Sequence, residues 1–112
     1  MADIKFTSNV NDILSALEKG KRNALTAIGA TAETYAKKET PVDTGRLRNS
    51  ISHTVDGEAA YIGSNVEYAP YVELGTSRAK AHHMLQKAAT EHSAEYKRLA
   101  EDAVYSAINN SQ

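Results

Sequence analysis

Four histidines, at positions 53, 82, 83 and 92, are the side chains best suited to hold a metal ion. His82 and His83 are adjacent, so on a helix their side chains point about 100° apart and do not readily share one ion. His92 falls on an apolar helical face, where a histidine of the core or of an interface is expected. Spacing and context therefore favour structural roles, and neither a metal nor a cofactor is predicted.

Two carboxylates, Glu67 and Glu73, bracket a tyrosine-rich turn and have the residue type of an acid–base pair. The chain has no Gly-x-Ser-x-Gly, no phosphate-binding glycine loop and no His-Glu-x-x-His. It has no cysteine, which excludes a thiol nucleophile, a thiolate metal site and a disulfide. Solvated or subunit-contacting roles explain the two glutamates better, and the chain is predicted not to be an enzyme.

A length of 112 residues suits one domain, residues 1–112, with residues 1–8 and 109–112 as flexible ends. No apolar run approaches the roughly 20 residues that span a bilayer. The first residues lack the basic-then-apolar order of a secretory signal. The expected location is the cytoplasm, or a particle assembled there.

The formal net charge of −1 excludes the global positive field that drives non-specific DNA binding. A local exception lies at residues 77–90, where Arg78, Lys80 and Lys87 occur without an acid. Solvated loops and helix ends explain this basic segment most simply, and a surface facing DNA or a contact with another subunit are the alternatives. Neither zinc-finger spacing nor a helix-turn-helix pattern is present, so sequence-specific DNA recognition is not expected.

Two long helices are predicted from apolar residues spaced three or four positions apart. The first covers residues 10–36 and ends before Pro41, because proline disfavours a helical conformation in the preceding residue. Gly20 and Gly29 each weaken its middle by about 1 kcal/mol relative to alanine, so a bend can form at either. The second helix covers residues 83–109.

A β-hairpin is predicted between the two helices, because Asp56-Gly57 is a strong two-residue turn signal between alternating apolar residues. Pairing about this turn places Val55 opposite Glu58. One face of the hairpin then carries the larger apolar side chains, as in a sheet that is buried on one side. The two strands are residues 51–55 and 59–62.

Residues 41–49, before the hairpin, are predicted as a turn-rich entry. Asp43-Thr44-Gly45 suits a cap or tight turn, and Gly45 is expected to adopt a positive φ. Leu47 is expected to fix this corner in the core, together with Ile51 of the first strand.

Residues 66–76, after the hairpin, are predicted as one short helical turn. Pro70 fits its first position, and Gly75 fits the residue just past its end. Three side chains are expected to pack this short turn: Tyr68, Tyr71 and Leu74.

The fold class that follows is α+β: two long helices packed against a small antiparallel sheet built on a β-hairpin, plus one short helical turn. A helix of about 30 residues is about 45 Å long, whereas a compact domain of this size has a diameter of roughly 35 Å. The first helix must therefore bend or extend onto a neighbouring molecule. A two-stranded hairpin is also marginal on its own in water, so both features favour an oligomer.

Two dense motifs resemble a known family. Residues 41–51 match its pattern Pro-Val-Asp-Thr-Gly-x-Leu-x-x-Ser-Ile, and residues 68–76 match Tyr-Ala-x-Tyr-Val-Glu-x-Gly-Thr. The resemblance is to the tail-completion, or head–tail joining, proteins of long-tailed (siphovirus) bacteriophages and prophages, and it covers roughly residues 10–105. The chain departs from the pattern at residues 81–84, Ala-His-His-Met, where members often have Arg-Pro-Phe. The motif residues with an expected fold or assembly role are Pro41, Asp43, Thr44, Gly45, Leu47, Ser50, Ile51, Tyr68, Tyr71, Glu73, Gly75 and Thr76.

The resemblance implies a virion structural protein, a head–tail connector or minor tail component. It would form a homo-oligomeric ring, such as a hexamer, at the head–tail junction of a particle assembled in the host bacterial cytoplasm. Its partners would be the head-closure protein and the tail-terminator or tail-tube proteins, with no membrane involved. DNA would pass through the lumen, in transient non-specific contact with Arg78, Lys80 and Lys87. The alternative is a small bacterial partner-binding or regulatory module with a helical interaction groove.

Overall fold

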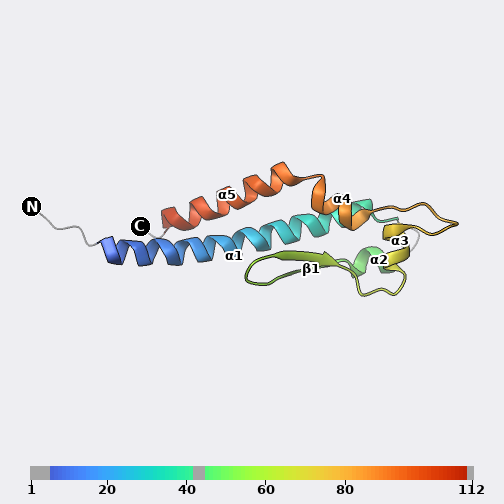
Figure 1. Ribbon diagram of the computed structural model, residues 1–112, viewed down its shortest axis with the longest axis horizontal. Coiled ribbons are helices and arrows are strands. Elements are labelled where there is room, and N and C mark those ends of the chain that lie inside the picture. Colours follow the sequence, from blue (N-terminus) through green and yellow to red (C-terminus); the bar gives the residue numbers. More distant parts are fainter. Residues whose placement is uncertain (1–5, 42–44, 111–112) are drawn as a thin grey trace, which may run out of the picture.

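A computed structural model describes residues 6–41 and 45–110 (Figure 1). The described chain is mainly helical and contains one antiparallel sheet of two strands. Its elements are α1 (Phe6–Glu39), α2 (Gly45–Ser50), β1 (Ser52–Val55), β2 (Ala60–Gly63), α3 (Ala69–Leu74), α4 (Met84–Thr90) and α5 (Ser93–Asn110).

Helix α1 lies between the other elements (Figure 1). Helices α4 and α5 pack along one side of it, and the hairpin of β1 and β2 packs along the other. This arrangement confirms the predicted α+β class, with a long helix on the small antiparallel sheet and the short helical turn as α3.

The first predicted helix is confirmed and is longer than expected, because α1 begins at Phe6 and ends at Glu39. The buried Thr40 lies just past its end, where its hydroxyl donates to the Ala36 carbonyl at 2.7 Å. Pro41 follows directly and prevents another helical turn. Residues 6–8 and 109–110 are helical, whereas residues 1–5 and 111–112 lie outside the described part.

Helix α1 continues through Gly20 and Gly29 as one helix. Of the two predicted alternatives, a bend at one of these glycines or an extended helix, the structure has the extended helix. The molecule measures 76 × 23 × 20 Å, with a radius of gyration of 19.1 Å. A compact domain of this length has a radius of gyration of about 13 Å. The chain is therefore a rod, and α1 runs along most of it (Figure 1).

Both glycines of α1 lie where another element comes close. A Cβ on Gly20 would lie 2.8 Å from the Cα of Val104 in α5. A Cβ on Gly29 would lie 2.9 Å from the Cδ2 of His53 in β1. The glycines thus allow α5 and the hairpin to approach α1 closely, at the cost in helix propensity that the sequence indicates.

The second predicted helix is two helices, which corrects the expectation of one helix over residues 83–109. Helix α4 ends at Thr90, a turn follows, and α5 begins at Ser93. The chain changes direction between them, so α4 and α5 lie at different angles along α1 (Figure 1).

Hydrogen bonding and aromatic stacking explain this break. The Tyr96 hydroxyl donates to the Ala88 carbonyl, which is the oxygen that would accept from the His92 N–H in a continuous α-helix. The His92 ring also stacks on the ring of Tyr35 in α1, with centroids 3.5 Å apart and an angle of 4° between the planes. The contact agrees with the expected core or interface role of His92.

The hairpin forms where it was predicted, but in a different register. Val55 pairs with Ala60 and His53 pairs with Ile62, so the predicted pairing of Val55 with Glu58 is wrong by two residues. A shift of two positions leaves every side chain on its original face. The predicted division into an inner and an outer face is therefore confirmed by the alternating burial of both strands.

Asp56 accounts for the shifted turn of the hairpin. Its N–H donates to the Ala59 carbonyl at 3.0 Å. Its carboxylate accepts from the N–H groups of Glu58 and Ala59 at 3.0 and 3.1 Å. These N–H groups, first that of Glu58, hold the pKa of Asp56 below its ordinary value. The turn thus places Gly57 and Glu58 at its tip, one residue later than the Asp56-Gly57 signal suggests.

Residues 45–50 form the short helix α2, where a turn-rich entry was predicted. Gly45 begins this helix and is outside the left-handed region, so its expected positive φ is wrong. A Cβ at Gly45 would make only an ordinary contact of 3.5 Å with Nδ2 of Asn49. Asp43 and Thr44, to which a cap or tight turn was assigned, lie outside the described residues.

The hydrophobic core lies at one end of the rod, where the C-terminal half of α1 meets α2, α3 and α4. Ile51 and Met84 are its largest fully buried side chains. The contact of α1 with α5 is built differently, from small residues such as Ala16 and Ala107 that let the two helices approach. The buried core residues are Ala36, Leu47, Ile51, Val66, Ala69, Met84 and Ala88.

Candidate functional site

The two sequence motifs meet at the core end of the rod. Leu47 and Ile51 of the first motif pack in one cluster with Ala69 of the second. Tyr68 is partly buried against the same cluster. The predicted core roles of Leu47 and Ile51 are confirmed, and the apolar motif residues hold α2 and α3 together.

Ser50 connects the first motif to the segment that leads into the second. Its hydroxyl donates to the Leu47 carbonyl at 2.6 Å and shares a hydrogen bond with the Ser64 hydroxyl. The Ser64 hydroxyl in turn accepts from the N–H of Val66 at 3.1 Å. These bonds fix the end of α2 against the chain that leaves β2.

Glu73 caps helix α4. Its Oε1 accepts from the N–H of Leu85 at 2.8 Å, and its Oε2 accepts from the N–H of Gln86 at 3.0 Å. The residue before α4, His83, has a left-handed backbone (φ 51°) and makes no side-chain cap of its own. The carboxylate of the second motif therefore supplies the acceptors and the negative charge that a helix N-terminus favours.

Glu73→Gln is expected to lower the free energy of unfolding by about 1 kcal/mol, because the amide keeps one acceptor but loses the charge and the second acceptor. Urea unfolding measures this loss. Glu67→Gln is the matched control: it removes a carboxylate from an exposed ion pair, so a much smaller effect on unfolding is expected. Equal effects of the two substitutions would contradict the capping role.

Gly75 and Thr76 shape the loop between α3 and α4. Gly75 has a φ of 78°, and a Cβ there would lie 2.7 Å from the Ala81 nitrogen. The Thr76 hydroxyl accepts from the N–H groups of Arg78 and Ala79 at 3.1 and 3.0 Å. The loop returns to α3, with its N–H groups at His82 and His83 bonded to the carbonyls of Val72 and Glu73. The position predicted for Gly75, just past the short helical turn, is confirmed.

A groove of about 560 Å³ opens where the two motifs and this loop meet. Its walls are mainly aromatic and aliphatic, with basic and polar groups beside them. The lining residues are Pro41, Arg46, Leu47, Tyr68, Tyr71, Val72, Thr76, Ala79, Lys80 and His82. The groove thus gathers residues of both motifs, including the exposed Tyr71.

The electrostatics of the groove are set mainly by basic residues. The Arg46 guanidinium makes two bonds of 3.1 Å to the Glu67 carboxylate and lies 5.6 Å from the centre of the Tyr68 ring. The pKa of Glu67 is lowered, first by its own backbone N–H and then by Arg46. Glu67 is therefore engaged by Arg46, Glu73 caps α4, and the two glutamates do not form an acid–base pair with each other.

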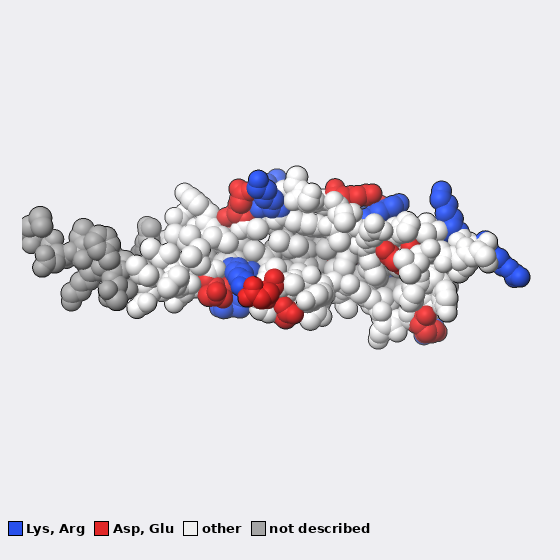
Figure 2. Space-filling model, in the orientation of Figure 1, with Lys and Arg blue, Asp and Glu red and all other residues white. Residues whose placement is uncertain are grey.

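The basic segment divides among three places. Lys80 lines the groove, and Arg78 lies on the exposed loop before α4. Lys and Arg side chains project from the end of the rod where this loop lies (Figure 2). Lys87 lies on α4 and is 3.7 Å from the Glu39 carboxylate of α1. The three cations expected to share one DNA-facing surface therefore have different surroundings.

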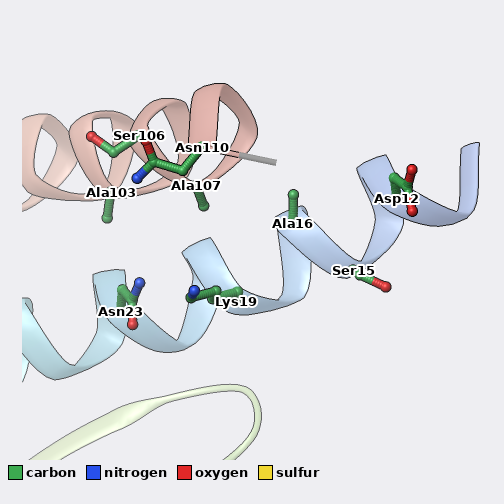
Figure 3. Close-up of a pocket in the computed structure, with 9 residues that line it drawn as sticks. All are labelled: Asp12, Ser15, Ala16, Lys19, Asn23, Ala103, Ser106, Ala107 and Asn110. Carbon is green, nitrogen blue, oxygen red and sulfur yellow. The ribbon is translucent and has the colours of Figure 1, made fainter. Parts of the chain in front are cut away.

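A second hollow, of about 410 Å³, lies between the N-terminal half of α1 and the C-terminal end of α5 (Figure 3). Ala103 and Ala107 of α5 point toward α1, and Ala16 of α1 points toward α5. The polar residues around it lie on separate helical turns, which is typical of a solvated surface between helices. Its other lining residues are Asp12, Ser15, Lys19, Asn23, Ser106 and Asn110.

Within the described ranges, 6–41 and 45–110, the structure brings together no group of three histidine or carboxylate side chains that could hold a metal ion. His53 instead pairs with Glu33 at 3.0 Å, and Lys37 binds the other Glu33 oxygen at 3.1 Å. The hydrogen bond from His53, and next that from Lys37, lowers the pKa of Glu33. None of the helices in the described part is both long and apolar enough to cross a membrane.

Comparison with known families decides between the classes that remain. Residues 4–75 match the family model described as "Bacteriophage HK97-gp10, putative tail-component". The chain belongs to the HK97-gp10-like family. The matched part contains the first motif and nearly all of the second, so the phage tail family that the motifs resembled is confirmed. No curated protein and no solved structure matches the chain.

In this HK97-gp10-like chain, several motif residues have structural roles. Leu47 and Ile51 build the core, Glu73 caps a helix, and Gly75 allows a backbone turn. The groove was not predicted, because its lining comes from segments far apart in the sequence. Tyr71 and Leu74 are 62% and 70% exposed, so the prediction that they pack the short turn is wrong, and Tyr71 borders the groove instead.

Proposed function

We propose that the chain is a non-catalytic virion structural protein that completes the tail and joins it to the head. It acts as one subunit of a homo-oligomeric ring at the head–tail junction, and DNA passes through the lumen of this ring. Its neighbours are the head-closure protein on one side and the tail-terminator or tail-tube protein on the other. The family match over residues 4–75 carries the proposal, since it identifies a phage tail component.

The shape and surface of the molecule support a role in assembly. A rod of 76 × 23 × 20 Å exposes a large surface for the size of its core. Large apolar side chains are exposed toward both ends of this rod, with Leu14 at 55% and Leu74 at 70%. Exposed apolar clusters of this kind mark contacts with other proteins. The chain thus has the surface expected of a subunit that is covered in a particle.

Contact with DNA is assigned to few residues in this proposal. Lys80 borders the groove and Lys87 pairs with Glu39. Arg78, on the exposed loop, is the cation of the basic segment best placed to face the lumen. A weakly positive lumen suits passage, because strong attraction to phosphates would hold the DNA in place.

Loss of the protein is expected to produce DNA-filled heads and free tails that do not join, with a large fall in infectious titre. The experiment disrupts the gene in the phage or prophage that encodes it and counts particles by electron microscopy. A plasmid copy of the wild-type gene should restore joined particles, and mass spectrometry should find the protein in them. Joined, infectious particles that lack the protein would overturn the proposal. If the chain belonged to the alternative class, a partner-binding or regulatory module, mass spectrometry would not find it in purified particles.

A further inference from the structure

The apolar stripe of α1 is longer than the elements that cover it. From Ala16 onward α1 has neighbours in α5 and then in the hairpin, and its small residues Ala16, Ala24, Ala32 and Ala36 are buried. Nearer the N-terminus the stripe continues on four large side chains that remain 38–55% exposed in the described chain. These four residues, the uncovered stripe, are Val10, Ile13, Leu14 and Leu17.

The spacing of the uncovered stripe is that of a helix that binds in a groove. Its members occupy positions i, i+3, i+4 and i+7, which place them on one face over two helical turns. Helices that bind in apolar grooves present their anchors at these four positions. The stripe therefore has the form of a ligand for a complementary groove.

The same chain has a groove of suitable chemistry. Leu47, Tyr68, Tyr71 and Val72 give the groove between α2, α3 and the following loop an apolar lining. Its volume of about 560 Å³ is enough to take several side chains. Tyr71, on the wall of the groove, is 62% exposed, so this part of the wall is as uncovered as the stripe.

The stripe and the groove of one molecule lie too far apart to meet. The stripe is at the end of α1 that carries the N-terminus, whereas α2 and α3 lie at the other end of the rod (Figure 1). The molecule is 76 Å long, and α1 is a single helix between the two ends. A contact between stripe and groove must therefore join two molecules.

The charges of the two surfaces are complementary. Glu18 lies one helical turn after Leu14 and borders the uncovered stripe. Asp12 lies on another side of α1, where it lines the hollow against α5. The groove is bordered by Lys80 and Arg46. Opposite charges around two apolar surfaces favour their encounter and fix their orientation.

We propose that the uncovered stripe of α1 docks in the groove of a second copy of this chain. Each copy then presents a stripe at one end and a groove at the other, so the contact is heterologous and repeats from copy to copy. A heterologous contact forms a ring when the rotation between neighbours closes. The inference deepens the proposed function, on whose ring it rests, by naming the two faces that form the subunit contact.

Disulfide trapping tests this contact directly, because the chain has no native cysteine. Ile13→Cys and Tyr71→Cys are made in separate full-length proteins, mixed, and oxidised mildly. The mixture is expected to form a linked dimer in several-fold higher yield than a mixture of Ser15→Cys with Tyr71→Cys. Ser15 is the matched control, since it lies two residues from Ile13 on a different face of α1. A single chain carrying both Ile13→Cys and Tyr71→Cys should give a ladder of linked oligomers.

Three outcomes would overturn the inference. Equal yields from the Ser15 and Ile13 mixtures would show random collision, and no linked dimer in any mixture would show that the contact does not form. A linked dimer from Ile13→Cys alone, in yield equal to the mixture, would show that stripe meets stripe. Charge complementarity adds a separate check: Glu18→Lys should lower the yield, and Lys80→Glu in the partner should recover it.

The trapping experiment tests the subunit contact, and the particle experiment tests the head–tail role, so either proposal can be overturned without the other. Linked dimers from a protein that is absent from purified particles would overturn the head–tail role and leave the subunit contact in place. A protein that is required for head–tail joining but gives no linked dimer would keep its role and lose the proposed contact.

Discussion

Replacing Gly75 with valine is expected to lower the free energy of unfolding by about 3 kcal/mol, the combined effect of backbone strain and overpacking. Gly75 has a φ of 78°, a conformation in which a β-branched side chain is strongly disfavoured. Its Cβ would also lie 2.7 Å from the Ala81 nitrogen and 3.0 Å from the Ala79 carbonyl oxygen. Both obstacles are backbone atoms, so no rotation of a side chain relieves the clash.

Urea unfolding followed by circular dichroism measures this loss, and Gly57→Val is the matched control. A Cβ on Gly57 has no neighbouring heavy atom within 4 Å, and its backbone is outside the left-handed region. The control should therefore stay within about 0.5 kcal/mol of the wild type. Equal stability of the two variants would show that the loop between α3 and α4 does not have the described conformation. Gly45→Val, at the glycine first expected to have a positive φ, should resemble the control.

Local signals in the sequence were sufficient for the helices and turns that depend on neighbouring residues. The 3–4 spacing of apolar residues predicts α1, and Pro41 predicts its end. Pro70 and Gly75 predict the start and end of α3 in the same way. The faces of the hairpin also follow from local alternation, which is why they survive an error of two residues in register.

Contacts between distant or competing groups explain what the sequence did not predict. The hairpin register depends on the Asp56 carboxylate, which takes the N–H groups of the turn. The break between α4 and α5 depends on the Tyr96 hydroxyl and on the Tyr35 ring of α1. Spacing of apolar residues does not report such bonds, so a continuous helix was the natural prediction.

The candidate site was predicted only in part, for the same reason. The motif residues were identified, but Glu73 was expected to be solvated or in contact with a subunit, whereas it caps a helix that begins eleven positions later. The absence of a capping side chain at His83 is a signal in the sequence that points to an acceptor from elsewhere. The groove required knowledge of how α2, α3 and the loop meet, which depends on the core.

Gly20→Val is expected to lower the free energy of unfolding by about 2 kcal/mol, although it replaces a residue that is poor in helices. A Cβ at this position would lie 2.8 Å from the Val104 Cα, 3.2 Å from the Ala107 Cβ and 3.3 Å from the Ala103 carbonyl oxygen. Helix propensity alone would give a gain of roughly 0.5 kcal/mol for this change. The sign of the change in the free energy of unfolding therefore shows whether the close packing of α1 on α5 outweighs the higher helix propensity of valine.

Ala30→Val is the matched control, because Ala30 is exposed on the same helix and its substitution changes propensity but not packing. It should cost about 0.5 kcal/mol. Hydrogen exchange identifies which element is destabilised. Gly20→Val should speed exchange of the α5 amides, because the added methyl groups must push α5 away from α1. A Gly20→Val protein as stable as the wild type, with unchanged exchange in α5, would show that the helices are not held at the described distance. Because the uncovered stripe ends at Leu17, before Gly20, separation of α5 should leave the disulfide yield between Ile13 and Tyr71 unchanged if the neighbouring copy contacts only the stripe.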